Sequence, residues 1–303
     1  MIDELIFELS HNCNLRCVMC SFGGAIDSSR FMDVRMFEKI VLKYGKITHS
    51  IRLNGRGEST IHPDFRRMLY SVRNQFNVMP INLFTNMMTA DIKIVDSFVE
   101  CGVTLFVSRD SCDNLELSEI RKGANLRRIE QNLANIEDID PRPTIVFTLQ
   151  HLNFHRVFDI AEYALNHDCS ILYNVIHGPL ADPLIALLET KSQWLEEQFY
   201  RVNAIYSDSK LQYLIPSHVA GIPLNIDGSI PTCGAKDNCD VMGRRLCVFY
   251  DGKVGPCNML NPYYIGNMLT DEIEDIVSGE LLAQFQHEYR DNKYCRNCAN
   301  MGI

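Results

Sequence analysis

The octapeptide CNLRCVMC, at residues 13–20, places three cysteines in one short loop: Cys13, Cys17 and Cys20. Three thiolates at these spacings can bind three irons of a four-iron cluster and leave the fourth iron without a protein ligand. A metal site that performs chemistry keeps such a position open, whereas a structural site is normally closed by four ligands. The next cysteine along the chain is Cys101, so the alternative, a zinc knuckle, would need a ligand from a distant segment.

The cysteine loop follows a predicted strand. Residues 3–9 form a short apolar run, which the residues SHN interrupt just before Cys13. Folds of the α/β class place their chemistry at the carboxyl ends of strands. In this setting, the pattern Cys-x3-Cys-x2-Cys resembles the radical S-adenosylmethionine (radical SAM) superfamily.

That resemblance implies that S-adenosylmethionine (SAM) binds the open iron through the amino and carboxylate groups of its methionine moiety. An electron passed to the sulfonium then breaks a carbon–sulfur bond and yields a 5′-deoxyadenosyl radical. The resemblance also implies an electron donor of the flavodoxin or ferredoxin type. Met19 stands where the family usually has an aromatic residue near the adenine, so we expect Met19 to make that contact.

The composition excludes several classes of protein. The chain of 303 residues has a formal net charge of −9 and no basic stripe, which argues against a nucleic-acid partner. We find no signal peptide and no apolar run of membrane-spanning length, so we expect a cytoplasmic protein without a membrane partner. Twelve cysteines in such a chain indicate metal ligation more than disulfides.

Six strand patterns alternate with patterns of helical period. The strands are predicted at 3–9, 50–57 (a strand that runs into a glycine turn), 81–86, 104–110, 144–150 and 170–176. The helices between and after them are predicted at 33–47, 62–76, 89–102, 116–136, 154–168 and 184–207. This alternation predicts an α/β fold with a parallel sheet and right-handed crossovers. The pattern fits an open doubly wound sheet or a partial barrel, and the radical SAM resemblance implies a partial (β/α)6 barrel.

The pattern changes near residue 215, where short strands, turns and cysteines replace the helices. We therefore predict a barrel domain over 1–215, with the active-site [4Fe–4S] cluster and SAM, and a small cluster-binding domain over 216–303. In the second domain, Cys247 and Cys257 flank a predicted hairpin with Asp-Gly in its turn. Cys295 and Cys298 form a Cys-x2-Cys pair after a predicted helix at 271–289. Zinc and a [4Fe–4S] cluster suit such a four-thiolate site equally on geometry.

The order of hairpin cysteines, a GNM tripeptide, a short helix and Cys-x2-Cys resembles the Twitch domain, a shortened SPASM extension of radical SAM enzymes. This resemblance implies an auxiliary [4Fe–4S] cluster on the four cysteines, and thus two [4Fe–4S] clusters in the protein. The chain ends five residues after Cys298, so we do not expect a second complete auxiliary cluster.

Several segments match the SAM-contacting positions of the superfamily. The turn Gly55-Arg56-Gly57-Glu58 stands where the family has a glycine–glutamate motif, and Glu58 would bind the methionine amino group of SAM. A glycine turn with a solvated Glu is the alternative. The resemblance gives the cofactor-binding set as Met19, Gly55, Gly57, Glu58, Asn86, Ser108 and Arg121. Arg121 suits bidentate carboxylate binding, although a solvated charge is equally consistent with its position.

Five cysteines remain outside these sets. We expect Cys101 and Cys169, at helix ends, to be inert. Cys112 follows Ser108 at the predicted mouth and is a candidate substrate-side thiol. Cys233 and Cys239 precede the hairpin and could be spare metal ligands, hydrogen-atom donors or structural thiols.

The resemblance leads to a functional hypothesis: a radical SAM enzyme that abstracts hydrogen from a small, polar, sugar- or cyclitol-like metabolite. Only twelve residues precede Cys13, which disfavours a leader-binding domain and hence a peptide substrate. We expect a natural-product tailoring dehydrogenase. An epimerase with a Cys hydrogen donor and a peptide maturase are alternatives, and a non-catalytic zinc or iron–sulfur binding module is the alternative of another class.

Overall fold

A computed structural model describes residues 2–20, 27, 29–89, 91–137, 139–232, 239, 241–258, 263–295 and 298. The chain forms two compact units, each assembled from separate segments. Unit 1 comprises Met1–Phe106, Arg127–Pro141 and Val241–Glu288, and unit 2 comprises Val107–Leu126, Arg142–Asp240 and Tyr289–Ile303. The division at residue 215 follows the change in sequence pattern, and it stays a prediction.

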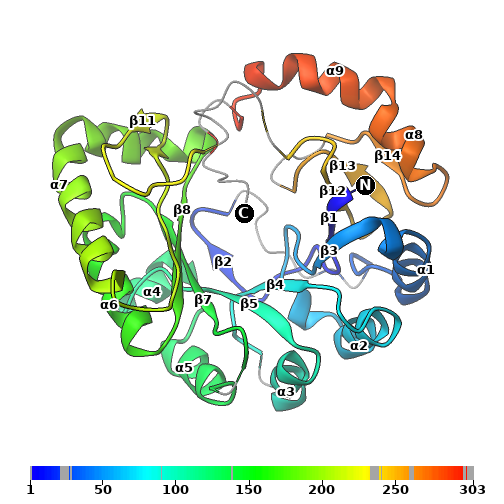
Figure 1. Cartoon of the computed structure of the whole chain (residues 1–303), viewed down its shortest axis with the longest axis horizontal. Helices are drawn as coiled ribbons and strands as arrows, with labels where there is room; N and C mark the ends of the chain where they lie inside the picture. The colour runs from blue at the N-terminus through cyan, green and yellow to red at the C-terminus, as the bar shows by residue number, and fades with distance from the viewer. Residues whose placement is uncertain are drawn as a thin grey trace. The chain divides into compact units, whose positions relative to one another are not determined.

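The sheet of unit 1 takes strands from both ends of the chain. Parallel strands β1 (Ile2–Phe7), β3 (Thr48–Arg52), β4 (Ile81–Thr85) and β12 (Arg245–Val248) lie in the order β12-β1-β3-β4. Antiparallel strands β13 (Lys253–Gly255) and β14 (Gly266–Asn267) follow beyond β12. Strands β12 and β13 form the predicted hairpin, and β12 pairs directly with the first strand of the chain (Figure 1).

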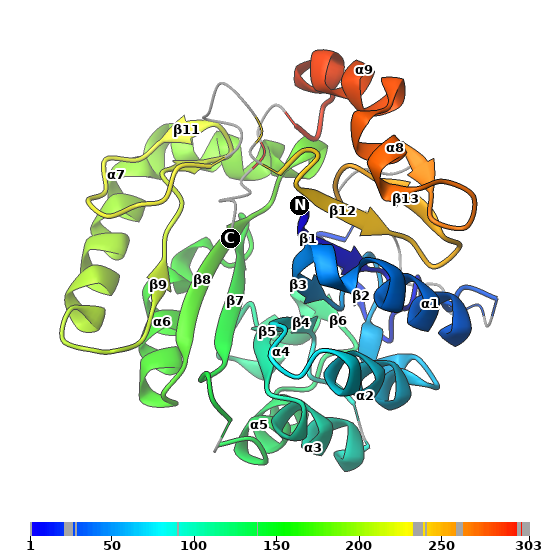
Figure 2. The same cartoon turned by 45° about the vertical axis from the view of Figure 1, so that its right-hand side comes forward.

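The residues of β1 alternate between two faces, as the period of a strand requires. Leu5 and Phe7 are fully buried on one face, where the Phe7 ring meets Phe37 of helix α1 (Val34–Tyr44) edge-on, with ring centroids 4.8 Å apart. Glu4 points to the other face, where its Oε1 accepts a hydrogen bond of 3.0 Å from Arg52 Nε. Helices α1, α2 (Phe65–Gln75) and α3 (Ile92–Glu100) lie along one side of the strands (Figures 1 and 2).

Unit 2 is a second βα arrangement with its own core. Strands β7 (Thr144–Leu149), β8 (Ser170–Val175) and β9 (Tyr213–Leu214) pair in parallel. Helices α6 (Val157–Asn166) and α7 (Asp182–Tyr206) pack on one another. Buried Tyr173 of β8 meets the Phe147 and Phe199 rings edge-on, and its hydroxyl donates to the Val157 carbonyl at 2.6 Å. This bond satisfies the one polar atom of a buried aromatic side chain.

The remaining elements are short. They are β2 (Arg16–Cys17), η1 (Gly45–Ile47), η2 (Ser59–Ile61), β5 (Val103–Ser108), α4 (Asn114–Ile120), β6 (Arg121–Lys122), α5 (Leu126–Ala134), η3 (Phe154–Arg156), η4 (Gly178–Ala181), β10 (His218–Val219), β11 (Ile222–Pro223), α8 (Ile273–Ser278), α9 (Glu280–Glu288) and η6 (Tyr289–Asp291). No helix in the described ranges is long and apolar enough to cross a membrane.

The predicted α/β class with a parallel sheet is confirmed, and all six predicted strands are present. Two predicted elements differ in extent. The helix predicted at 116–136 is divided into α4, β6 and α5, because Gly123 has φ of +94°, which no helix accommodates. The helix predicted at 271–289 breaks at Gly279, which has extended dihedrals. In the segment 50–57 the strand ends at Arg52 and the predicted glycine turn follows it.

His62, between η2 and α2, is a buried histidine with both ring nitrogens in hydrogen bonds. Its Nε2 lies 2.9 Å from the Met32 carbonyl oxygen, and its Nδ1 accepts from the Asp64 N–H at 3.0 Å. This pairing requires a neutral ring with the proton on Nε2, because Nδ1 is an acceptor. Burial lowers the pKa of His62 below its ordinary 6.5, although the Met32 carbonyl and Asp64 oppose the shift.

We predict that His62 makes the protein less stable in mild acid. A lowered pKa means that the unfolded chain binds the proton more readily than the folded chain. The contribution of neutral, buried His62 to the free energy of unfolding is therefore complete above pH 6.5 and falls as the pH drops below 6.5. The loss is at most about 1.4 kcal/mol for each pH unit. Denaturant unfolding from pH 8 to pH 5 should therefore show a steeper loss of stability in the native protein than in His62→Gln. Parallel profiles would contradict the prediction.

Candidate functional site

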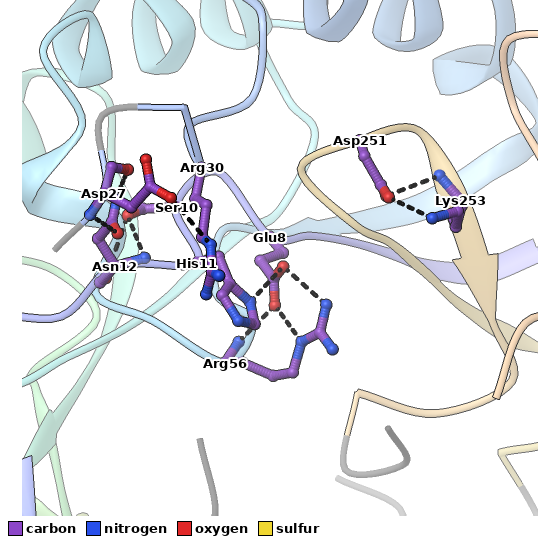
Figure 3. Close-up of polar contacts among 9 residues, drawn as sticks. All are labelled: Glu8, Ser10, His11, Asn12, Asp27, Arg30, Arg56, Asp251 and Lys253. Atoms are coloured by element: carbon purple, nitrogen blue, oxygen red, sulfur yellow. Dashed lines mark hydrogen bonds and ion pairs between the residues drawn. The ribbon is translucent and has the colours of Figure 1, made fainter. Parts of the chain in front are cut away.

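The loop after β1 is closed by the side chain of Asn12, immediately before the cysteine motif. Asn12 Nδ2 donates to the Asp27 carbonyl at 2.8 Å, and the Asp27 N–H donates to Asn12 Oδ1 at 2.7 Å. The Ser10 hydroxyl accepts from the Asn12 N–H at 3.0 Å. Asn12 is fully buried. Its two hydrogen bonds with Asp27 join the chain on either side of the cysteine segment (Figure 3).

The three cysteines of this loop are all partly exposed. The Cys20 N–H donates to the Cys17 carbonyl at 3.1 Å, and the Leu15 N–H donates to Cys13 Sγ at 3.4 Å. The pKa of Cys13 is raised to about 12, chiefly by burial and also by Glu58, Cys17 and Cys20, against the lowering effect of the Leu15 N–H. Three neighbouring thiolates would repel one another, and a bound cation removes this repulsion and favours their ionised form.

The donor set of this loop fits an iron–sulfur cluster in its chemistry. Three soft sulfur ligands on one exposed loop suit iron–sulfur binding, with a position left for a further ligand. Among the described residues, however, no three His, Cys, Asp or Glu side chains are already arranged to hold a metal ion. The three cysteines therefore lie in one loop, but their sulfur atoms are not placed as ligands around a common metal position.

The turn after β3 lies in close contact with the loop after β1. A Cβ on Gly57 would lie 2.2 Å from the Asn12 carbonyl oxygen and 2.3 Å from that of Ser10. A Cβ on Gly55 would lie 2.4 Å from Glu8 Cβ. The Glu58 N–H then donates to the Asn12 carbonyl at 2.8 Å. Both glycines predicted from the sequence are thus needed so that two backbone segments can approach.

Glu58 is buried and joins this turn to the end of β4. Its Oε1 accepts from the Thr60 hydroxyl at 2.7 Å, the Thr60 N–H at 3.2 Å and the Thr85 hydroxyl at 2.8 Å. Its Oε2 accepts from the Asn86 N–H at 2.8 Å. The Asn86 side chain donates to Asn14 Oδ1 at 2.8 Å. Glu58 and Asn86 therefore lie beside the cysteine loop, and the alternative of a solvated Glu58 is wrong.

Two of the predicted SAM contacts lie in unit 2. Ser108 is half-buried at the end of β5. Arg121 is buried, and its Nε donates to Asp110 Oδ2 at 2.6 Å. Asp110 is fully buried, and its Oδ1 accepts from the Thr148 N–H of β7 at 2.7 Å. Arg121 is thus paired with a carboxylate, which corrects the alternative of a solvated charge. Its proposed contact with SAM stays a prediction, as does that of half-buried Met19.

The structure distinguishes Cys247 from the other predicted auxiliary ligands. Cys257, Cys295 and Cys298 are partly exposed. Cys247 has no exposed surface, lies opposite Ile6 in the sheet, and packs with Ile6, Phe249 and Tyr264. A ligand sulfur must reach its metal, and this residue is fully buried in the sheet, where Glu8, Arg56 and Cys257 also act on the pKa of its thiol.

The other thiols have different surroundings. Cys239 is partly exposed, and Cys233 lies outside the described residues. The Cys112 thiol donates to the Asp159 carbonyl of α6 at 3.7 Å, and burial raises its pKa. Cys101 and Cys169 are buried, and burial raises the pKa of each to about 11. A raised pKa keeps these thiols protonated, so Cys101 and Cys169 are poor nucleophiles.

The sequence analysis did not find the ion pair of Glu8 and Arg56. Arg56 Nε and Nη2 donate to the two carboxylate oxygens of Glu8 at 2.6 and 3.0 Å, and His11 Nδ1 lies 3.2 Å from Glu8 Oε1 (Figure 3). The charged residue between two glycines was the one available signal for Arg56. Its partner lies 48 positions away, which no local pattern indicates.

Comparisons with known proteins agree with this geometry. The sequence model of the Radical SAM superfamily matches residues 7–176, and that of the SPASM iron–sulfur cluster-binding domain matches residues 239–299. The chain belongs to the radical SAM superfamily, a superfamily of enzymes that use SAM and an iron–sulfur cluster, and it carries a C-terminal SPASM domain.

The individual proteins that match this chain share little sequence identity with it. A tungsten-containing aldehyde ferredoxin oxidoreductase cofactor-modifying protein of Pyrococcus furiosus is 23% identical over 97% of this chain and 86% of the relative. The structure of SuiB from Streptococcus suis bound to S-adenosylmethionine has a TM-score of 0.72 at 14% identity, over 94% of this chain and 68% of that chain. The structure of anSMEcpe with bound AdoMet has a TM-score of 0.72 at 16% identity, over 98% of this chain and 88% of that chain. At these identities the structural likeness is one of fold.

We predict that Gly57→Ala lowers the free energy of unfolding by at least about 2 kcal/mol, because the new Cβ meets two carbonyl oxygens that cannot move independently. Gly228→Ala is the matched control. Gly228 has φ of +75°, and no atom of the described residues lies within 4 Å of an added Cβ, so its cost is only the backbone term of about 1 kcal/mol. Denaturant unfolding of both variants measures the difference, and equal losses would contradict the close approach.

Proposed function

We propose that the chain binds an active-site [4Fe–4S] cluster through Cys13, Cys17 and Cys20 and SAM through the turn at 55–58 and Asn86. The observation that carries this proposal is the direct linkage of the three segments. The Glu58 N–H donates to Asn12, the Glu58 carboxylate accepts from the Asn86 N–H, and the Asn86 side chain donates to Asn14 inside the cysteine motif. All three segments follow the carboxyl ends of neighbouring parallel strands, β1, β3 and β4.

When bound, SAM and the reduced cluster supply the 5′-deoxyadenosyl radical that removes a hydrogen atom from the substrate. The residues of the chain orient the two cofactors. Glu58 Oε1 accepts three hydrogen bonds, whereas Oε2 accepts one from the described residues. Oε2 therefore retains acceptor capacity for the methionine ammonium of SAM, and the Oε1 contacts keep the carboxylate in place.

We further propose an auxiliary [4Fe–4S] cluster, with Cys257, Cys295 and Cys298 among its ligands. The fourth ligand is the point at which we depart from the sequence prediction. The complete burial of Cys247 in the sheet, packed on Ile6 and Phe249, speaks against it. Cys239 is partly exposed, and it is the residue at which the SPASM match begins. We therefore propose Cys239 in place of Cys247.

For the substrate, we retain a small polar metabolite that is oxidised at a carbon bearing a hydroxyl group. The 5′-deoxyadenosyl radical would take a hydrogen atom from that carbon. The resulting carbon radical would pass one electron to the proposed auxiliary cluster and its hydroxyl proton to solvent, which gives a ketone. The curated relative is named for the modification of a cofactor, which is consistent with a small-molecule substrate. A peptide is the second candidate, because SuiB and anSMEcpe have also been solved with peptides bound.

We predict about eight irons per chain after anaerobic reconstitution, as two four-iron clusters. Replacing Cys13, Cys17 and Cys20 together with Ala should leave about four irons per chain and abolish formation of 5′-deoxyadenosine from SAM, because one cluster loses all of its protein ligands. Iron analysis and chromatography of the nucleoside products measure both effects. Full SAM cleavage by the triple variant would overturn the assignment, and a zinc-loaded native protein without iron would favour a non-catalytic binding module.

The same iron analysis tests the fourth auxiliary ligand. We predict that Cys239→Ala lowers the content to about four irons per chain, since a three-thiolate auxiliary site binds weakly, whereas Cys247→Ala keeps about eight. Cys247→Ala is the matched control, because it removes the same thiol from the same domain. The reverse result would return Cys247 to the ligand set.

We predict that turnover in deuterated water gives a product two hydrogens lighter than the substrate, with no deuterium at the reacting carbon. An oxidised carbon receives no hydrogen, whereas an epimerised carbon receives one from an exchangeable thiol. Mass spectrometry of the product distinguishes the two. Deuterium at an inverted carbon that disappears in Cys112→Ala or Cys233→Ala would establish epimerisation and identify the donor.

A further inference from the structure

Arg56 lies within the proposed SAM-binding turn, but its side chain leaves the turn and contacts two other segments of unit 1. It is buried between Gly55 and Gly57. Its backbone N–H, Nε and Nη2 donate to the Glu8 carboxylate at 3.0, 2.6 and 3.0 Å. Figure 3 shows the guanidinium and the carboxylate side by side. The pair therefore joins the glycine turn to the end of β1, five residues before Cys13.

Glu8 depends on this pairing because it has no exposed surface. Burial alone would raise the pKa of Glu8, but hydrogen bonds from His11 and Arg56 and the Arg56 charge outweigh burial and lower the pKa. The carboxylate is thus ionised inside the protein. An ionised buried group without its partner is strongly destabilising, so the geometry of Arg56 is restricted to positions that satisfy Glu8.

Arg56 also contacts the hairpin of the SPASM domain. The guanidinium carbon lies 4.1 Å from the centroid of the Phe249 ring. Phe249 directly follows β12, and its N–H donates to the Lys253 carbonyl of β13 at 2.8 Å. The ring is fully buried and meets Tyr264 edge-on, with centroids 5.5 Å apart. Phe249 therefore cannot shift without shifting the hairpin that leads to Cys257.

We propose that Arg56 is a positioning residue through which the hairpin of the SPASM domain sets the affinity of the glycine turn for SAM. This inference rests on the proposed function, since it takes the turn as the SAM-binding segment. Arg56 can face Phe249 and bind both oxygens of Glu8 only when the glycine turn and the hairpin keep the relative position that they have in this structure. A hairpin held by metal at Cys257 thus holds the turn in its binding conformation. Loss of that metal loosens the turn and weakens SAM binding, although the side chains of Arg56 and Phe249 are not among the proposed SAM contacts.

The rival explanation is that Arg56 only stabilises the fold. Arg52 is the matched control that tests this explanation. Arg52 also binds a buried carboxylate through two nitrogens, with Nε 3.0 Å from Glu4 Oε1 and Nη2 2.8 Å from Glu4 Oε2. Its guanidinium likewise faces a phenylalanine, Phe84, at 4.9 Å. Both pairs connect β1 with β3 or the turn after it, but Arg52 lies before the glycine turn and its ring partner is in β4. Arg52 also interacts electrostatically with Cys257 of the hairpin, and a Lys at this position keeps the positive charge of that interaction.

The experiment compares SAM affinity among variants of the full chain after anaerobic reconstitution, by equilibrium dialysis with SAM alone. Lys keeps the charge of Arg56 but loses the bidentate contact and the flat stacking surface. Mutation of residues that orient the ligands of a metal site from outside it typically costs about 10- to 100-fold in metal affinity or activity, and we take the same scale for the glycine turn. We expect Arg56→Lys to weaken SAM binding at least about tenfold and Phe249→Leu to do the same, with iron content unchanged. Arg52→Lys should lower the thermal midpoint similarly but leave SAM affinity within about twofold.

The coupling itself is tested by Cys257→Ala, alone and combined with Arg56→Lys. In the native background, the loss of this ligand should weaken SAM binding about tenfold, whereas in the Arg56→Lys background it should add little, because the connection is already broken. Native SAM affinity in Arg56→Lys, or an equal effect of Cys257→Ala in both backgrounds, overturns the inference. If the native protein binds no SAM, the proposed function itself fails. Phe249→Leu keeps the test decisive should Arg56→Lys not fold.

Discussion

The site depends on the close approach of two backbone segments, residues 10–12 after β1 and residues 55–58 after β3. Gly57 lies so near the Ser10 and Asn12 carbonyls that a single added carbon would overlap both oxygens. The approach places the Glu58 N–H on the Asn12 carbonyl, one residue before the first cysteine of the motif. The glycine turn thus holds the cysteine loop and the proposed SAM contacts in one arrangement, and a substitution at Gly57 would disturb both.

A second constraint is that the SPASM hairpin is part of the sheet of unit 1. Strand β12 covers the edge of β1 with four parallel register pairs, from Glu4 with Arg245 to Phe7 with Val248. Without it, β1 would be an edge strand with unpaired backbone groups. The cysteine loop therefore leaves a strand that a segment some 240 residues later completes. The two predicted functional domains are for this reason not independent in their packing.

The sequence sufficed for features that depend on local pattern. The six strands follow from apolar runs bounded by turns, and the two cysteine motifs follow from spacing. Features that depend on tertiary contact could not be predicted. The ion pair of Glu8 and Arg56 joins residues 48 positions apart, and the burial of Cys247 arises only when β12 lies against Ile6. The break at Gly123 was missed because a single glycine does not cancel an otherwise helical period.

The buried carboxylates at the strand ends follow one rule. Glu8 accepts from the Arg56 N–H, Glu58 accepts from the Asn86 N–H, and Asp110 accepts from the Thr148 N–H. In each case an acidic residue at or beyond the end of one strand binds the backbone of a later strand or the loop after it.

These carboxylates are at most 4% exposed, so each needs its donors to offset the loss of water. A loop that supplies such a donor cannot move away without leaving a buried carboxyl group unsatisfied. Loops at the carboxyl ends of strands are ordinarily the most mobile part of an α/β protein. Here buried, hydrogen-bonded carboxyl groups beneath them supply the rigidity that radical chemistry requires, since a reactive intermediate must meet one C–H bond and exclude its neighbours.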